Sequence, residues 1–264
     1  MHFKRILMIC IMYVVLVAVW WVVASQNEGY PSPISTYQVA FGGIDKHGEE
    51  IQSVLANGFY IGEDEEQGVF WHLLDSLAYL FGGFALVLFV GLPLGLLVGL
   101  SPTFKYGYDV ITGSLKAIAP VVWLPFVLIL VQDTVMVALI TIFLAALWPL
   151  VSSTAFGIKM IHQDYLKMSK TLQLTRTELL VDIILPLIVP YIFDGIRRSL
   201  WIAWVTIIPI EMLLEDKGLG HWVWNAYNEE MQEQIIIGMV LIYVLGSIIG
   251  YVLKLVADYF NYMD

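Results

Sequence analysis

Charged residues are scarce in this chain of 264 residues. Asp, Glu, Lys and Arg make up only 14% of it, hydrophobic residues make up 59%, and the mean hydropathy is +0.79. A typical soluble domain carries about 25% charged residues, so this chain has too little polar surface to cover a soluble core. Its apolar runs are long and continuous rather than alternating, which argues against an outer-membrane barrel. The composition therefore predicts an all-α polytopic membrane protein.

Motifs for catalysis, metal binding and nucleotide binding are also lacking. The single cysteine, Cys10, lies in an apolar run, which excludes a disulfide framework and a thiolate metal site. The five histidines are scattered, and no HExxH, GxSxG or P-loop motif occurs. The net charge of −10 leaves no basic stripe for nucleic acid. We therefore expect a non-catalytic chain without cofactor or metal, so that ATP and Mg²⁺, if they drive it, bind to another subunit.

Six continuous apolar segments predict membrane-spanning helices within one transmembrane domain, residues 1–264. About 20 apolar residues are needed to cross roughly 30 Å of hydrocarbon. A cleaved secretory signal is the alternative interpretation of the first segment, but its apolar run is longer than the roughly 7–15 residues of such signals. The predicted spans cover residues 6–25, 74–100, 110–131, 135–156, 186–213 and 235–256.

The loops between these spans predict the orientation of the chain. Residues 26–70 are rich in Gly, Pro and acids, which indicates an external loop with one short surface helix. Lys and Arg concentrate on the cytoplasmic side of inner membranes. With six spans and the N-terminus inside, only Lys46 and Lys217 of the loop cations lie outside, so both termini are expected in the cytoplasm. The cations placed inside are Lys4, Arg5, Lys105, Lys159, Lys167, Lys170, Arg176 and Lys254.

Three glycines at four-residue spacing, Gly91, Gly95 and Gly99, lie in the second predicted span. Small residues at this spacing let two helix backbones approach closely in a membrane. We therefore expect this face to pack tightly against another helix.

The longest cytoplasmic interruption, residues 157–185, predicts a docking loop. Residues 164–190 read DYLKMSKTLQLTRTELLVDIILPLIVP, with apolar residues between cations. A short amphipathic helix held in such a loop is typical of an element that docks onto a partner protein.

This loop resembles the coupling loop of type I importer permeases of the ATP-binding-cassette class. The family frame E-A-A-x-x-x-G-x9-I-x-L-P falls on 167–169, Gln173, and Ile183 to Pro186 with its spacing kept. The first four identities differ, and the Ile-x-Leu-Pro end is intact. Replacing Gln173 by the family's Gly should have little effect or loosen the loop slightly, because Gly costs about 1 kcal/mol in a helix.

Further segments resemble the nitrate/sulfonate/taurine subgroup of these permeases, and within it the nitrate and bicarbonate branch. The resemblance extends over residues 30–256. It rests on Leu185-Pro186-x3-Pro190-x4-Gly195-x-Arg197, Ala203-Trp204, Glu211-Met212-Leu213 and the segment from Gly218 to Asn228.

The resemblance implies a type I importer permease bundle with a cytoplasmic coupling helix, located in the inner (plasma) membrane. It implies a lipid bilayer, a second permease copy, two cytoplasmic ATP-binding-cassette ATPase subunits and an external solute-binding protein as partners. ATP-driven closure of the ATPases then switches the bundle between inward and outward access. The residues implied in coupling are Tyr165, Lys167, Met168, Ser169, Lys170, Leu172, Gln173 and Leu174.

Four residues are candidates for an anion path: Arg197, Arg198, Lys116 and Trp204. An ionisable group at bilayer depth is costly and therefore indicates function, and a guanidinium matches two oxygens of an oxyanion. Each also has a structural interpretation. Asp194 can pair with one or both arginines, Lys116 can extend to the interface, and Trp204 can simply pack.

Candidates for an outer gate lie near the external end of the fifth span and in the loop after it. An exposed acid and an interfacial aromatic belt are the alternative interpretations. The candidates are Glu211, Trp222, Trp224 and Tyr227.

The leading functional interpretation is the membrane subunit of an ATP-driven importer for a small oxyanion of nitrate, nitrite, cyanate or bicarbonate type. A sulfonate or taurine importer of the same family is the main alternative, and a thiamine-precursor importer is a weaker one. A self-sufficient anion channel or carrier is an alternative from another class, for which a docking loop would have no use. A membrane enzyme lacks support, since no nucleophile and base occur in a recognisable arrangement.

Overall fold

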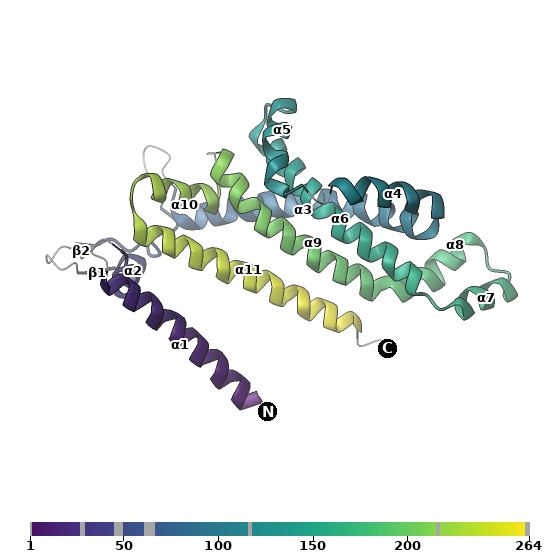
Figure 1. Ribbon diagram of the computed structural model, residues 1–264, viewed down its shortest axis with the longest axis horizontal. Coiled ribbons are helices and arrows are strands. Elements are labelled where there is room, and N and C mark those ends of the chain that lie inside the picture. Colours follow the sequence, from purple (N-terminus) through teal and green to yellow (C-terminus); the bar gives the residue numbers. More distant parts are fainter. Residues whose placement is uncertain are drawn as a thin grey trace. The chain divides into compact units, whose positions relative to one another are not determined.

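Helices make up nearly all of the secondary structure in the computed structural model, which confirms the all-α prediction (Figure 1). The structure describes residues 2–26, 30–44, 50–60, 67–115, 118–214 and 217–261. The chain forms two compact units. The first comprises residues 1–74 and 217–243, and the second comprises residues 75–216 and 244–264.

The first unit combines the N-terminal helix with the segments that are predicted to be external. Its helix α2 is the short helix expected in the external loop, and Ser32 caps it by accepting a hydrogen bond of 3.0 Å from the backbone N–H of Ser35. Two-residue strands β1 and β2 pair antiparallel, with Gly43 opposite Ile51. The elements are α1 (His2–Gln26), α2 (Pro33–Phe41), β1 (Gly43–Ile44), β2 (Glu50–Ile51), the first turn of α3 (Val69–Leu100), α10 (Leu219–Asn228) and the beginning of α11 (Gln232–Asn261).

The second unit contains the remaining parts of α3 and α11 and the helices between α3 and α10. Residues 179–184 form a π-helix, η2, which joins the docking loop to α9. The elements are α4 (Pro102–Leu115), the 3₁₀ turn η1 (Pro120–Val122), α5 (Trp123–Leu130), α6 (Thr134–Met160), α7 (Gln163–Thr171), α8 (Arg176–Glu178), η2 (Leu179–Ile184) and α9 (Leu185–Leu214).

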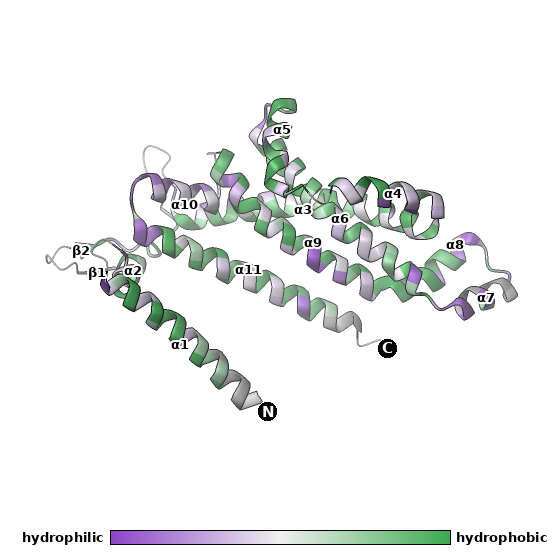
Figure 2. Ribbon diagram, viewed as in Figure 1, coloured by the Kyte–Doolittle hydropathy of each residue, from purple (hydrophilic) through white to green (hydrophobic). Residues whose placement is uncertain are grey.

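Among the described residues, four helices are long and apolar enough to cross a membrane: 69–100, 134–160, 176–214 and 232–257. Helix α1 adds a shorter apolar segment, Cys10–Gln26. In Figure 2 hydrophobic residues dominate these long helices, while hydrophilic residues gather on α7 and α8. A multi-pass membrane protein accounts for this distribution, and the count of six spans stays a prediction.

The structure differs from the sequence prediction at the third span, residues 110–131. Helix α4 begins already at Pro102 and ends at Leu115, and the helical pair Pro102–Leu115 and Pro120–Leu130 is bent by 86°. Proline lacks the backbone N–H of a helix interior, and it disfavours helical geometry in the residue before it. Pro120 therefore begins a new helix and does not continue α4.

Helix α6 is the centre of the second unit, and α3 packs closely on one side of it. A Cβ atom added at Gly91, Gly95 or Gly99 would lie 2.9, 2.7 or 2.5 Å from a side chain of α6, namely that of Leu150, Thr154 or Ile158. Such distances are shorter than any van der Waals contact. The close approach predicted for the three glycines is therefore confirmed, and α6 is the partner helix.

Helix α9 packs along α6 in the same way (Figure 1). A Cβ atom at Gly195 of α9 would lie 2.9 Å from Ser153 Cβ, and one at Gly157 of α6 would lie 2.7 Å from Tyr191 Cβ. Helix α4 is attached to α6 by the hydroxyl of Tyr108, which lies 2.8 Å from Ser152 Oγ. The core of this unit is thus built on close contacts around α6.

The C-terminal end of α7 corrects the expectation for Gln173. Its φ is +53°, which places it in the left-handed region beyond the helix. The Leu174 N–H donates to the Ser169 carbonyl at 3.1 Å, the 6→1 bond of a Schellman end. The expectation that glycine would loosen this position as a helix residue is wrong, because a left-handed conformation favours glycine.

We predict that Gly95→Ala destabilises the chain although alanine is the better helix former. The added methyl group would meet the stiff, β-branched Thr154, and overpacking of this kind costs about 1–3 kcal/mol. Gly107→Ala in α4 is the matched control, because a Cβ atom there meets nothing within 4 Å. Thermal unfolding in detergent should show a lower midpoint for Gly95→Ala only. Equal midpoints would contradict the close α3–α6 contact.

We also predict that Gln173→Gly stabilises the end of α7. Removing the side chain relieves a left-handed conformation that costs a non-glycine residue roughly 1–2 kcal/mol, partly offset by the greater backbone entropy of glycine. Hydrogen exchange of the α7 amides should slow a few-fold. Gln163→Gly at the other end of α7 should instead speed exchange, since glycine lowers helix stability. Faster exchange in Gln173→Gly would show that its backbone does not need the left-handed conformation.

Candidate functional site

The predicted docking element is an exposed helix, α7, followed by the Schellman end. Tyr165, Met168 and Leu172 are exposed apolar residues, whereas Ser169 is only 5% exposed and faces the body of the protein. At 100° per residue, Tyr165, Met168 and Leu172 lie on one stripe. This stripe is the kind of surface that a groove in a partner covers.

The lysines of α7 lie apart from this stripe. Lys167 falls about 130° around the helix from the middle of the stripe, and its ammonium lies 3.4 Å from Asp164 Oδ1. Lys170 is in the same helix, but its side chain lies outside the described part of the structure. Gln173 and the half-buried Leu174 belong to the turn after the helix. The structure therefore separates the predicted coupling residues into an apolar stripe, a polar face and a turn.

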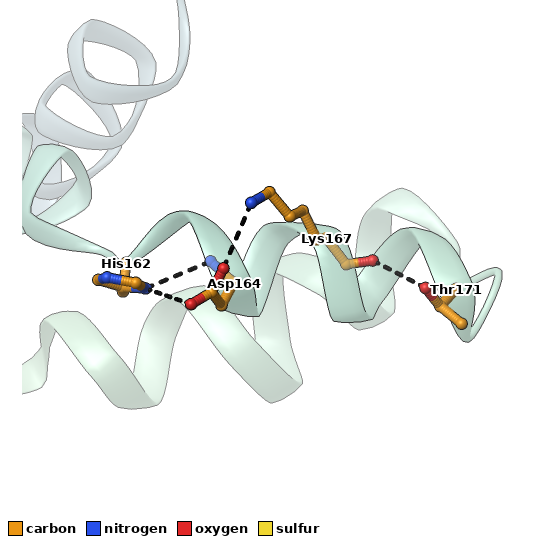
Figure 3. A network of polar contacts seen from close by, with 4 residues as sticks. All are labelled: His162, Asp164, Lys167 and Thr171. Atoms are coloured by element: carbon orange, nitrogen blue, oxygen red, sulfur yellow. Dashed lines mark hydrogen bonds and ion pairs between the residues drawn. The ribbon is translucent and has the colours of Figure 1, made fainter.

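A small polar network begins α7 (Figure 3). His162 Nδ1 lies 3.0 Å from Asp164 Oδ2, Lys167 contacts the other oxygen of the same carboxylate, and the Thr171 hydroxyl donates to the Lys167 carbonyl at 3.2 Å. These side chains are highly exposed, and exposed ion pairs of this kind contribute roughly 0–1 kcal/mol. The network orients the first turns of α7 more than it stabilises the fold.

One continuous helical segment connects the docking loop with the candidate anion path. Elements α8, η2 and α9 form a single helix of 39 residues, from Arg176 to Leu214. It is about 58 Å long at 1.5 Å per residue, nearly twice the roughly 30 Å of hydrocarbon. Helix α8 begins with a capping box, in which Thr175 accepts from the Glu178 N–H and Glu178 Oε2 accepts from the Thr175 N–H at 2.7 Å.

Asp194 pairs with both arginines of the candidate path. Its Oδ1 lies 3.0 Å from Arg197 Nη2, and its Oδ2 lies 2.8 Å from Arg198 Nη2. The spacings i,i+3 and i,i+4 place the three residues on one face of α9. Arg197 lies about 18 Å from the beginning of α9 and about 26 Å from its end. The pairing with Asp194, which was the structural interpretation of the two arginines, is thus present in the structure. One positive charge remains on the cluster.

Two cavities adjoin this face of α9, and they share Pro149, Trp201 and Ile202. The cavity at the arginines has a volume of 590 Å³ and is lined by Pro149, Arg197, Arg198, Trp201, Ile202, Ile249, Gly250 and Leu253. The other has a volume of 540 Å³ and is lined by Leu115, Ile118, Pro120, Trp123, Leu144, Ala145, Trp148, Pro149, Ser152, Trp201, Ile202, Val205 and Thr206. The walls are mostly apolar, with a few hydroxyl groups and the two guanidiniums.

The other two candidates for the path are placed differently. Trp204 is 3% exposed and packs against α11, where a Cβ atom at Gly246 would lie 2.6 Å from its Nε1. It lines neither cavity, so its role in the structure is packing. Lys116 lies outside the described residues, although its neighbours Leu115 and Ile118 line the second cavity. Trp201, which was not among the candidates, is 54% exposed and lines both cavities.

The predicted gate residues lie on α9 and α10. Glu211 is 2% exposed, so it is not the exposed acid of the alternative interpretation. In α10, Trp222 packs against Gly238 of α11, and Trp224 stacks on the exposed Tyr227 with ring centroids 5.4 Å apart. Gly218 precedes this helix with a φ of +102°, which requires glycine.

Sequence spacing missed one pair, His72 and His221, which the fold of the first unit brings together. Their ring centroids are 5.9 Å apart, and His221 Nε2 lies 2.9 Å from the side-chain nitrogen of Asn225. The two histidines come from segments remote in sequence, and no local pattern marks the contact. Among the described residues, no group of three or more His, Cys, Asp or Glu side chains is arranged to hold a metal ion.

Comparison with known proteins agrees with this architecture. Residues 91–262 match the family described as the inner membrane component of binding-protein-dependent transport systems. The nitrate import permease NrtB of Leptolyngbya laminosa is 29% identical over 97% of this chain and 88% of its own length. The bicarbonate transport system permease CmpB of Synechocystis sp. is 33% identical over 78% of this chain and 75% of its own.

A solved structure has the same fold. A chain from the inward-facing MetNI methionine transporter of the ATP-binding-cassette class superposes with a TM-score of 0.63 at 16% identity. The match covers 71% of this chain and 93% of that one. On the family match and the bicarbonate permease together, the chain belongs to the family of inner membrane components of binding-protein-dependent transport systems.

Proposed function

We propose that the chain is the membrane-spanning subunit of an ATP-driven importer that carries a small oxyanion into the cytoplasm by alternating access. The substrate is of nitrate, nitrite, cyanate or bicarbonate type. The names of the relatives, a nitrate and a bicarbonate permease, support this substrate class. Family membership makes the chain a non-catalytic, multi-pass subunit of the inner membrane.

The observation that carries this proposal is the single helix from Arg176 to Leu214. It begins next to the exposed stripe of α7 and carries the Asp194–Arg197–Arg198 cluster in its membrane-spanning part. A push on α7 by a closing partner would pass through the turn at residues 172–175 into this helix, whose backbone hydrogen bonds continue to the arginines. The π-helix η2 lies between the two, and π-helices occur frequently at functional sites.

The chemistry of the cluster favours an oxyanion. Each guanidinium uses one donor nitrogen on Asp194 and keeps others for a ligand. Charge-assisted hydrogen bonds from guanidinium to planar oxyanions are strong and can be bidentate. The 590 Å³ cavity beside the guanidiniums is otherwise lined by apolar residues, and an apolar surrounding strengthens such an attraction.

The partners and the topology belong to the same proposal. One permease domain, residues 1–264, would pair with a second copy, two ATPase subunits that bind ATP and Mg²⁺, and an external solute-binding protein. The exposed apolar stripe of α7 supports docking to an ATPase. Both termini would lie in the cytoplasm. The spans would be near 6–25, 74–100, 110–131, 135–156, 186–213 and 235–256, with an external loop at 26–70 and the coupling loop at 157–185.

A sulfonate or taurine importer of the same family is the weaker alternative, because the taurine transport permease TauC of Escherichia coli is 28% identical to this chain, below the bicarbonate permease at 33% and the nitrate permease at 29%. A self-sufficient channel or carrier would need no ATPase. Stoichiometric co-purification of ATPase subunits separates an importer from a channel, and uptake of nitrate, bicarbonate or taurine by the reconstituted complex separates the substrates.

For the coupling, we predict that Met168→Glu lowers substrate-stimulated ATP hydrolysis by about tenfold or more, since a charge buried unpaired in an interface is strongly destabilising. Met168 is exposed, so the chain itself should still fold and insert. Gln163→Glu is the matched control: it adds the same charge to α7 on the face opposite the apolar stripe, and hydrolysis should stay near the parent level. Normal stimulation in Met168→Glu would refute docking through this stripe.

For the path, we predict that Arg197→Lys lowers uptake per assembled complex partially and that Arg197→Ala lowers it further, by roughly 10- to 100-fold. Lysine keeps the charge but loses the planar fork, and a charged hydrogen bond contributes about 1.5–3 kcal/mol. If Arg197 only braces α9, both variants should reduce the yield of complex and leave turnover unchanged. Asp194→Asn combined with Arg197→Gln should then restore the yield, and that pattern would contradict the pathway.

A further inference from the structure

The cluster on α9 contains one carboxylate for two guanidiniums. Both oxygens of Asp194 are engaged, one by each arginine. Within the described part of the chain, no other carboxylate lies within 4.0 Å of either guanidinium. Arginine stays protonated in proteins, so the two guanidiniums and one carboxylate carry a fixed net charge of +1.

This charge lies where an uncompensated charge is costly. The cluster is in the middle of a helix that crosses the hydrocarbon, and its cavity has otherwise apolar walls. Gly250 also lines this cavity, and a Cβ atom there would meet nothing within 4 Å. The cavity therefore has room for a ligand, and a ligand with one negative charge would make the site neutral.

We infer that Asp194 determines specificity by setting the charge of the transported anion to minus one. This inference rests on the proposed anion path at Arg197 and Arg198. A monovalent oxyanion brings the site to neutrality. A divalent anion leaves it negative, and a zwitterion such as taurine leaves it positive. Each mismatch leaves an unpaired charge in a medium of low dielectric constant, where charges interact strongly.

The pairing has a second consequence for selectivity. Asp194 occupies one donor nitrogen of each arginine, which leaves the two guanidiniums fewer donors for the four oxygens of a tetrahedral dianion. Asp194→Asn keeps an oxygen of nearly the same shape but removes the negative charge. The site then carries two positive charges, which favours a divalent anion.

The test is anion-dependent stabilisation of the full-length chain, purified with its co-purifying subunits in nanodiscs and without the solute-binding protein. The probes are nitrate, sulfate and taurine at matched ionic strength, with gluconate as reference. For the parent chain, the apparent Kd should be at least about tenfold lower for nitrate than for sulfate or taurine. In Asp194→Asn, the ratio of the two Kd values should shift toward sulfate by about tenfold or more.

A series of variants that differ in net charge separates this inference from a general loss of folding or assembly. Arg198→Gln has no net charge and should lose the anion-dependent stabilisation, whereas Asp194→Asn with Arg198→Gln regains one positive charge and should recover the preference for nitrate. This second comparison decides the matter even if Asp194→Asn alone does not assemble. Asp133→Asn is the matched control, because Asp133 is an exposed N-cap and asparagine caps equally well.

Two outcomes would overturn the inference. An unchanged nitrate-to-sulfate ratio in Asp194→Asn would show that Asp194 does not set the charge. A parent chain that binds nitrate and sulfate equally would show the same. Either result leaves the proposed function standing if Arg197→Ala still lowers nitrate uptake. An Arg197→Ala variant with normal uptake would instead refute the path itself.

Discussion

The close approach of helix backbones around α6 is the constraint on which the second unit depends. In a lipid environment, helices gain little from the hydrophobic effect when they associate, so packing and short contacts must hold them together. Glycines provide these contacts on both sides of α6: Gly95 faces it from α3, and Gly195 faces it from α9. Because Gly195 must face α6, the rotation of α9 about its own axis is fixed. That rotation places Arg197 and Arg198 at the cavity whose wall includes Pro149, a residue that both cavities share.

The same rotation gives α9 two different faces. Trp204 and Glu211 are buried in the bundle, whereas Arg197, Arg198 and Trp201 border the cavities. The continuous helix then extends from this face to the turn that follows α7. In the proposed function, docking, transmission and anion binding would fall on successive parts of one segment.

The sequence could predict the features that depend on local pattern. Apolar length marked the long helices, and four-residue spacing marked the glycine face of α3, although the partner helix could not be named. Asp194 at three and four residues from the arginines made their pairing foreseeable. The bend before Pro120 was missed because hydropathy is insensitive to backbone direction. The left-handed Gln173 was missed because glutamine gives no such signal, and the contact of His72 with His221 depends on the tertiary fold.

The bend between α4 and α5 also bears on hydration. A helix end leaves up to four carbonyl or N–H groups without helical partners, and such groups are not tolerated against lipid tails. The end of α4 supplies Leu115 to the 540 Å³ cavity and the beginning of α5 supplies Trp123, with Ile118, and Pro120 of η1, between them. The freed backbone groups therefore require protein or water beside them, and the cavity offers a place for water. Water there would give the second unit a hydrated side within the membrane, distinct from the side that faces lipid.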